Sequence, residues 1–184
     1  MYALDMLMFS RADFADPALT TFLQAHLDDV EPTAPPDSRH ALDLRALQAP
    51  GMRLWVGHSH SRLVATGALA IVGERHEEVK SMRTDPTYRG TGIGSAMVRQ
   101  LLQDARSRNV ERVSLETGSM GFFAAARALY AKHGFTPCAP FGGYVDDPNS
   151  VYLSLKLEAR PRVWSAVAKT GISENLVEIE PGRG

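Results

Sequence analysis

Hydrophobic and polar residues alternate along much of the chain with the two-residue period of a β-strand. Strands are predicted where this period holds between turn-forming residues, over 52–57, 63–72, 78–84, 113–117, 135–138 and 151–157. The last of these is the clearest, because valine or leucine occupies every second position from Val151 to Leu157. The first three follow one another through short turn-rich segments, and they predict an antiparallel meander.

Apolar residues spaced by three and four positions predict helices in the rest of the chain. Asp16-Pro17 has the form of an N-cap followed by a first-turn proline, and an apolar stripe then runs to Val30. A second stripe begins at Ile93 and ends near Asn109, which is predicted to cap it. Two shorter helices are predicted, over 41–48 and 122–133. Strands and helices together predict a fold of the α+β class, a sandwich of helices and sheet.

A glycine-rich loop, Arg89-Gly90-Thr91-Gly92-Ile93-Gly94, lies between a predicted strand and the start of a predicted helix. Glycines let backbone N–H groups converge without interference from a Cβ atom, and the helix adds the positive end of its dipole, so an anion is the expected ligand. A Walker loop is excluded because Ser95-Ala96 follows the last glycine where Lys and Ser or Thr would be needed. A dinucleotide-binding loop fits poorly, since its G-x-G-x-x-G spacing is absent.

The spacing Arg89-x-x-Gly92-x-Gly94 after the lead-in "DPTYRG" resembles the acyl-CoA-binding segment of the GCN5-related N-acetyltransferase (GNAT) family. A second segment, "LYAKHGF" over 129–135, is similar to another signature of the same family, and the resemblance covers roughly 53–157. It implies an acyl-CoA N-acyltransferase-like α/β/α sandwich with a mixed, mainly antiparallel sheet. It also implies transfer of an acetyl group from acetyl-CoA to a primary amine by direct attack.

The resemblance also implies which residues bind acetyl-CoA. Arg89 would supply a charge beside the pyrophosphate, and backbone N–H groups would cradle it, from Gly90, Thr91, Gly92, Ile93, Gly94 and Ser95. The backbones of Met82 and Thr84 would pair with the pantetheine arm as an added strand would. The N–H of Met82 would then also polarise the thioester carbonyl.

Two side chains are candidates for the proton transfers. By resemblance, Tyr130 would protonate the departing thiolate, although packing at helical spacing would also explain an aromatic residue there. Glu78 is the candidate base, and the strand period predicts that it shares a face with Met82. The alternatives are that Glu78 is a solvated carboxylate, or that Glu116 or water is the base. Phe123 replaces an asparagine that often contacts CoA in the family, so that contact is in doubt.

The acceptor is less well defined. Five aspartates lie in or near segments that border the acceptor cleft of relatives, and they favour a cationic amine, unless they are only solvated loop charges: Asp28, Asp29, Asp43, Asp146 and Asp147. The segment 141–144 would add an aromatic wall or form a long hairpin loop. "SMRTDP", "LETGSM" and "CAPFGGY" resemble a bacterial subgroup of small-molecule acetyltransferases named for indole-acetate. A peptide acetyltransferase and a non-catalytic acyl-CoA sensor remain the alternatives.

Composition sets the remaining limits. The formal net charge of -1 gives no basic field, so nucleic acid is not an expected partner. No export signal or long apolar run is evident, so a cytoplasmic protein without membrane contact is expected. The histidines lack partners at metal-ligand spacing, and no metal is predicted. Cys138 is expected to be a small buried residue, with a catalytic thiol as the alternative. The domain is predicted over 1–157 with a tail over 158–184, and a homodimer stays open.

Overall fold

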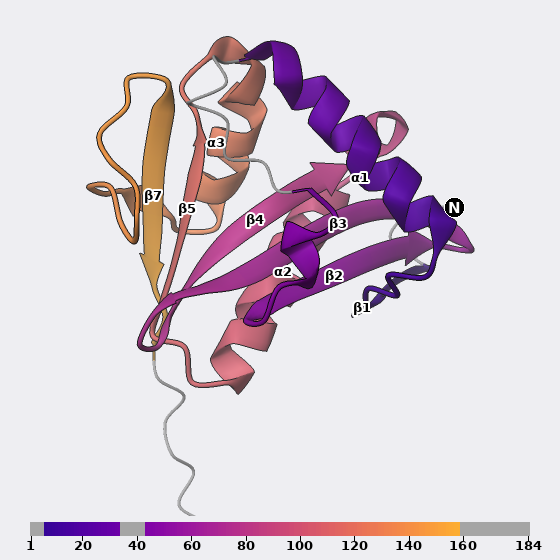
Figure 1. The fold of residues 1–184 in the computed structure, drawn as a ribbon, viewed down its shortest axis with the longest axis horizontal. Helices are drawn as coiled ribbons and strands as arrows, with labels where there is room; N and C mark the ends of the chain where they lie inside the picture. The colour runs from indigo at the N-terminus through magenta and orange to yellow at the C-terminus, as the bar shows by residue number, and fades with distance from the viewer. Residues whose placement is uncertain (1–5, 34–42, 159–184) are drawn as a thin grey trace, which may run out of the picture.

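A mixed sheet of seven strands organises the computed structural model, which describes residues 6–33 and 43–158 (Figure 1). The strands in chain order are β1 Leu7–Arg11, β2 Met52–Ser59, β3 Arg62–Gly73, β4 His76–Thr84, β5 Arg112–Gly118, β6 Thr136–Pro137 and β7 Ser150–Lys156. They lie in the order β1-β2-β3-β4-β5-β7-β6. Only the β4–β5 pair is parallel among these neighbours, which confirms the predicted mixed, mainly antiparallel sheet.

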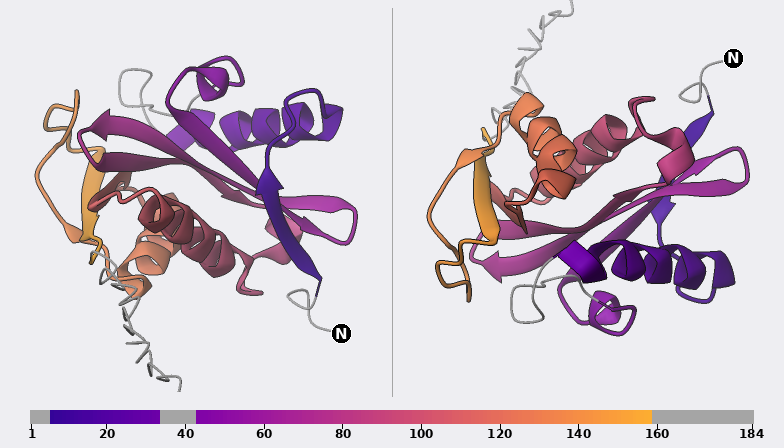
Figure 2. Two further views of the ribbon diagram at one scale, coloured as in Figure 1. Left: turned by 90° about the horizontal axis from the view of Figure 1, so that it is seen from below. Right: turned by 90° about the horizontal axis from the view of Figure 1, so that it is seen from above.

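Three helices cover the two faces of this sheet. They are α1 Pro17–Val30, α2 Ile93–Ser107 and α3 Ala124–Lys132. Figure 2 shows α1 against one face and α2 with α3 against the other, which is the predicted α/β/α sandwich. Each face has its own apolar core: Leu19 and Leu23 of α1 pack in one, whereas Met97 and Leu101 of α2 pack in the other. Among the helices that the structure describes, none has the length and apolarity that a membrane span would need.

Short 3-10 turns complete the described chain, and the helix ends follow the predicted capping signals. The turns are η1 Glu31–Thr33, η3 Ala46–Gln48, η4 Pro86–Tyr88 and η5 Gly121–Phe123. The Asp16 carboxylate accepts a hydrogen bond of 2.8 Å from the N–H of Ala18, with Pro17 at the first helical position. At the C-terminal end of α2, Asn109 follows the C-cap in a left-handed conformation with φ of 61°. Both caps were predicted.

Some elements differ from the sequence-based expectation. β1 was not predicted, because it is a short strand at the sheet edge that begins with three consecutive apolar residues instead of an alternating pattern. The helix expected over 41–48 is replaced, in its described part, by the η3 turn, whose first N–H donates to the Asp43 side chain. The strand expected over 135–138 is reduced to the two residues of β6. The tail lies outside the described residues beyond Glu158.

A β-bulge interrupts β4 just before its end. Arg83 pairs with Thr66 of β3 and Lys80 pairs with Ala68, so two residues of β4 lie opposite the single Gly67. One of those two, Ser81, has a positive φ of 50°. A Cβ atom at position 67 would lie 2.8 Å from Sδ of Met82, so the absence of a side chain at Gly67 makes room for the bulge.

The two parallel strands separate next to this bulge. β4 pairs with β5 only from His76 to Val79, whereas β5 stays paired with β7 along its whole length. Figure 1 shows β4 and β5 diverging toward their C-terminal ends. Within the described chain, the β4 backbone from Lys80 to Thr84 therefore faces an opening rather than a neighbouring strand on that side.

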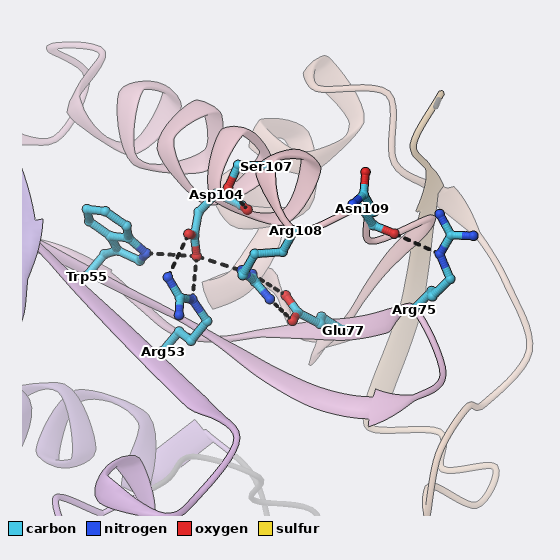
Figure 3. Close-up of polar contacts among 8 residues, drawn as sticks. All are labelled: Arg53, Trp55, Arg75, Glu77, Asp104, Ser107, Arg108 and Asn109. Atoms are coloured by element: carbon cyan, nitrogen blue, oxygen red, sulfur yellow. Dashed lines mark hydrogen bonds and ion pairs between the residues drawn. The ribbon is translucent and has the colours of Figure 1, made fainter. Parts of the chain in front are cut away.

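A network of charged side chains fixes α2 to the other end of the sheet (Figure 3). Asp104 of α2 accepts hydrogen bonds from Arg53 at 2.8 and 2.9 Å and from the Trp55 indole at 3.2 Å. Arg108, one turn further on, donates to Asp104 at 3.2 Å and forms a bidentate pair with Glu77 of β4. Burial alone would raise the pKa of Asp104, but these hydrogen bonds and charges outweigh it and hold that pKa below its usual value.

Replacing Asp104 should therefore destabilise the fold. Asp104→Ala would leave Arg53 and Arg108 without a shared carboxylate at a site where Asp104 is only 6% exposed, so we expect a loss of about 3 kcal/mol in the free energy of unfolding. Glu111→Ala is the matched control, because its ion pair with Arg75 is about half exposed on both sides and should contribute less than about 1 kcal/mol. Urea unfolding of both variants measures the difference, and equal losses would contradict the role given to Asp104.

Candidate active site

A groove of about 470 Å³ lies between the C-terminal half of α1, the glycine-rich loop and α3. Its walls come from three stretches of the chain that are distant in sequence, within 26–30, 82–95 and 122–132. They include His26, Asp29, Met82, Thr84, Arg89, Gly90, Gly92, Gly94, Ser95, Phe122, Phe123, Ala126, Leu129 and Tyr130. The groove therefore gathers most of the residues expected to bind acetyl-CoA. Thr91 and Ile93 are not among its lining residues: the N–H of Thr91 donates to the Tyr88 carbonyl at 3.4 Å, and the Ile93 side chain is buried in the core.

The glycine-rich loop leaves backbone donors unsatisfied at the mouth of α2. Gly90 and Gly92 have φ of 78° and 92°, a conformation that a side chain would strain. Gly92 is the N-cap of α2 and offers no side chain to the first turn, so within the described part of the chain these N–H groups receive no side-chain cap from the N-cap residue. A Cβ atom at Gly94 would lie 3.3 Å from Leu129 and from the Thr84 hydroxyl. The geometry suits close approach of an anion to the backbone.

The turn before this loop is stabilised by its own side chains. The Asp85 carboxylate accepts hydrogen bonds from the N–H and hydroxyl of Thr87 at 2.9 and 2.6 Å. It also forms an ion pair with Arg62 at 2.8 Å. Arg62 also lies over the ring of Tyr88, 5.5 Å from its centroid. These contacts explain locally why the "DPTYRG" lead-in delivers Arg89 to the groove.

Charges from α1 and β4 meet at the wall of the groove opposite α3. Arg83 is buried and donates to the Asp29 carboxylate at 2.6 Å and to the Ala25 carbonyl at 2.8 Å. Asp29 lies 3.9 Å from the guanidinium of Arg89. Burial, followed by the charge of Arg83, lowers the pKa of His26 to about 4, so this groove residue is neutral near pH 7. Nothing in the sequence pattern singled out Arg83.

Tyr130 lies in the groove, as does Phe123. The Tyr130 ring is buried and packs edge-on against Phe135, with centroids 5.7 Å apart. Burial and then the charge of Glu116 raise the pKa of Tyr130, so its phenol keeps its proton at neutral pH. Phe123 packs closely on Gly118, where a Cβ atom would lie 2.2 Å from the ring. The position that is often asparagine in relatives therefore forms an apolar wall here.

The expectation that Glu78 shares a face with Met82 is wrong. The bulge inserts one residue between them, which reverses the alternation, so Met82 turns to the core that α2 covers together with Val79. Glu78 is next to Val79 and thus lies on the opposite face, outside the groove. Its carboxylate is 4% exposed and accepts hydrogen bonds from Lys80 at 2.9 Å and from the Tyr144 hydroxyl at 2.6 Å.

Aromatic rings surround this carboxylate. Phe141 and Tyr144 have centroids 5.3 Å apart, and Tyr152 lies 5.5 Å from Tyr144. The segment 141–144 thus brings the Tyr144 hydroxyl to Glu78 and packs the Phe141 ring against that of Tyr144. The sequence did not single out Lys80, whose ammonium group also contacts the Tyr144 hydroxyl at 2.8 Å.

Most of the aspartates proposed to attract an amine serve local structure instead. Asp43 and Asp147 accept hydrogen bonds from backbone N–H groups of their own turns, and Asp28 accepts one from Gln24. Asp29 pairs with Arg83. Glu116 of β5, which accepts a hydrogen bond of 2.7 Å from Ser150, is the carboxylate with an electrostatic effect on Tyr130.

Other candidate chemistry lies apart from these groups. Cys138 is only partly buried, and burial raises the pKa of its thiol, which disfavours the nucleophilic thiolate. Among the residues that the structure describes, no three or more His, Cys, Asp or Glu side chains are arranged to hold a metal ion. Ser95 at the start of α2 is hydrogen-bonded to the His133 ring at 2.8 Å, which links α2 to the C-terminal end of α3.

The diverging parallel strand pair, the bulge beside it and the glycine-rich start of α2 together form a groove suited to an anionic ligand that pairs with a strand edge. The chain belongs to the acetyltransferase (GNAT) family, whose model matches residues 18–135. It is an acyltransferase, and this family uses acetyl-CoA. The family and fold that the sequence motifs implied are thus confirmed.

Relatives in bacteria support the same family. The chain is 41% identical over 145 residues to the uncharacterized N-acetyltransferase YedL of Escherichia coli, covering 79% of this chain and 91% of that one. It is 38% identical over 145 residues to the uncharacterized N-acetyltransferase YsnE of Bacillus subtilis, covering 79% and 96%. It is 37% identical over 136 residues to the IAA acetyltransferase of Azospirillum brasilense, covering 73% and 86%.

Solved structures show the same fold at lower identity. A GNAT acetyltransferase of Staphylococcus aureus superposes with a TM-score of 0.66 at 18% identity, covering 83% of this chain and 99% of that one. A Bacillus subtilis acetyltransferase solved in complex with CoA superposes with a TM-score of 0.59 at 14% identity, covering 83% and 99%.

The partly buried histidine of the groove, His26, should make stability depend on pH. The folded-state pKa of His26 is about 4, below the value of about 6.5 for an unfolded histidine, so its contribution is present above pH 6.5 and is lost as the pH falls toward 4. Glutamine at position 26 cannot be protonated. On acidification, the free energy of unfolding of His26→Gln should therefore fall by on the order of 2 kcal/mol less than that of wild type. Urea unfolding at several pH values measures this, and parallel curves for both proteins would contradict it.

Proposed function

We propose that the protein transfers the acetyl group of acetyl-CoA to a primary amine of a small molecule by direct attack. The observation that carries this proposal is the groove itself, in which the unpaired edge of β4, the glycine-rich helix start and the Tyr130 phenol line one space. An acyl-CoA needs an anion cradle, an edge for its amides and a proton for its thiolate. Each of these has a candidate in the groove.

The residues present fit acetyl-CoA as the donor. The N–H groups around Gly92 and Gly94 are suited to the pyrophosphate, and Arg89 supplies a positive charge beside them. The edge of β4 at Met82 and Thr84 would pair with the pantetheine amides, because β5 is no longer paired with β4 beyond Val79. The N–H of Met82 would orient the thioester carbonyl and stabilise its developing negative charge.

The proton transfers require one acid and one base. In the proposed reaction the amine loses a proton to Glu78, its nitrogen bonds to the acetyl carbon, and the carbon–sulfur bond breaks. Tyr130 gives its phenolic proton to the departing sulfur, a role supported by its place in the groove and by burial that keeps it protonated. Glu116 is the alternative base, since it lies close enough to influence Tyr130 electrostatically.

A small aromatic or apolar amine suits the surroundings of the proposed base. Phe141, Tyr144 and Tyr152 form the walls beside Glu78, and such rings complement flat apolar groups. The relative from Azospirillum brasilense is named an IAA acetyltransferase, which supports a small molecule as the acceptor here as well.

A screen of small amines tests the proposal directly. Purified protein and acetyl-CoA are combined with each amine, and release of the CoA thiol is followed together with the mass of the acetylated product. At least one small amine should be acetylated faster than any peptide of the panel. Running Glu78→Gln and Glu116→Gln on that amine identifies the base, because only its loss should remove the acid limb of the pH–rate profile. Acetylation of peptides alone would overturn the small-molecule assignment.

The cradle should be sensitive to negative charge. Gly94→Asp places a carboxylate in the groove where the pyrophosphate is expected, so the affinity for acetyl-CoA should fall at least about tenfold below that of Gly94→Asn. The two variants have nearly the same shape, and an acidic residue in the first turn of α2 does not weaken the helix. Calorimetry at low and high salt measures both, and the difference should shrink with salt. Equal affinities of the two variants for acetyl-CoA would contradict the proposal that the glycine-rich loop binds the pyrophosphate.

The phenol of Tyr130 should matter for turnover rather than for binding. Tyr130→Phe keeps the buried ring and removes the proton, so we expect turnover to fall by about 10²–10⁴-fold when departure of the thiolate limits the rate. Affinity for acetyl-CoA should change far less, because negative charge on sulfur develops only during the reaction. Single-turnover rates and calorimetry separate the two. Unchanged single-turnover rates would leave Tyr130 a packing residue.

A further inference from the structure

A primary amine of the protein itself lies against the proposed base. The Lys80 ammonium donates to the Glu78 carboxylate at 2.9 Å and to the Tyr144 hydroxyl at 2.8 Å, and it lies 5.4 Å from the centroid of the Tyr144 ring. The side chain of Lys80 is 16% exposed and that of Glu78 is 4% exposed. This is the contact that an acceptor amine must make before its proton is removed.

Lys80 also lies within reach of the proposed transfer site. It precedes Met82 by two positions on β4, and a strand rises about 3.3 Å per residue, so a lysine side chain of similar length spans the separation. The side chains of Lys80 and Met82 start on opposite faces of the sheet because of the bulge. The strand pairing that would separate the faces ends at Val79, so the opening between β4 and β5 connects them.

We propose that Lys80 is an acetylation site of this enzyme, modified by its own acetyl transfer. The proposal rests on the function proposed above. Glu78 accepts a proton from the Lys80 ammonium, and the freed nitrogen forms an amide bond to the acetyl carbon of acetyl-CoA. The carbon–sulfur bond breaks, and the thiolate takes the proton of Tyr130 or of water. The nitrogen loses its second proton to the phenolate or hydroxide left behind, and Glu78 releases the first proton to solvent. The products are Nε-acetyl-lysine and CoA, with no other reactant.

Selectivity among the lysines distinguishes this reaction from simple chemical acetylation. Chemical acetylation favours an amine that the reagent can reach, as at the exposed Lys156 of β7. The side chain of Lys80 is only 16% exposed and its ammonium group is held by Glu78 and the Tyr144 hydroxyl, so it should react slowly by that route. Faster modification of Lys80 than of Lys156 therefore requires help from the site.

Acetylation would change the proposed base as well. The amide of acetyl-lysine carries no charge, so the buried Glu78 carboxylate would lose its cation and keep only the Tyr144 hydroxyl as a partner among the contacts described here. The Glu78 carboxylate could then accept a proton from an added amine without competition from the Lys80 ammonium. Modified and unmodified enzyme should therefore differ in turnover of the same acceptor.

Mass spectrometry of the intact protein and of its peptides tests the proposal. Wild type is incubated with acetyl-CoA, and the acetylated fractions of Lys80 and Lys156 are followed in the same sample. Lys80 should be acetylated at least about tenfold faster than Lys156, and Lys80→Arg should remove one acetyl group from the intact mass. Glu78→Gln should slow modification of Lys80 by about 10²-fold or more, the usual contribution of a general base, and leave Lys156 unchanged. Melting curves and acetyl-CoA calorimetry on each variant confirm that it is folded and binds the donor.

Four results would overturn the proposal. The first is wild type that binds acetyl-CoA and leaves Lys80 no more acetylated than Lys156. The second is labelling of Lys80 that is equally fast in the folded Glu78→Gln variant, which would remove Glu78 from the reaction. The third is wild type without measurable affinity for acetyl-CoA, which would end the proposed function too. Transfer to an amine of the panel without modification of Lys80 would end this inference alone.

Discussion

The site depends on the point where β4 and β5 stop pairing. Two parallel strands that stay hydrogen-bonded leave no backbone group for a ligand, whereas here the pairing ends at Val79 and β5 continues beside β7. The bulge at Ser81 and Met82 falls directly after that point and turns the Met82 side chain into the core under α2. An open strand edge, flanked by a groove on one face and a buried carboxylate on the other, follows from these two irregularities.

The helix that covers this opening is fixed at its far end. Asp104 and Arg108 connect the last turns of α2 to β2 and to the paired part of β4, while the first turn of the same helix carries the anion cradle. A helix held at one end by directional, charge-assisted bonds transmits its position to the other end, because its backbone is stiff. Stability is thus concentrated away from the groove, and the donor site keeps free N–H groups.

Local patterns in the sequence predicted the parts of the fold that depend on local physics. The strand period located the β2–β4 meander, and Asp16 and Asn109 marked helix ends through their capping chemistry. The bulge was not visible, because it depends on how Gly67 of one strand meets another strand. The contacts of Tyr144 with Lys80 and Glu78 were equally hidden, since they join residues more than sixty positions apart. The family resemblance located the glycine-rich loop, but it could not reveal that the Lys80 ammonium is hydrogen-bonded to Glu78, the proposed base.

Gly67 and Met82 share one small volume beneath the bulge. A Cβ atom at position 67 would meet Sδ of Met82 at 2.8 Å and also approach Met97 and Leu101 at 3.0 Å. The size of residue 67 and the size of residue 82 are therefore coupled: a larger side chain on β3 is compatible with the bulge only if the one on β4 becomes smaller. A change in the depth of this groove therefore requires substitutions at both positions together, with the side chain enlarged on one strand and shortened on the other.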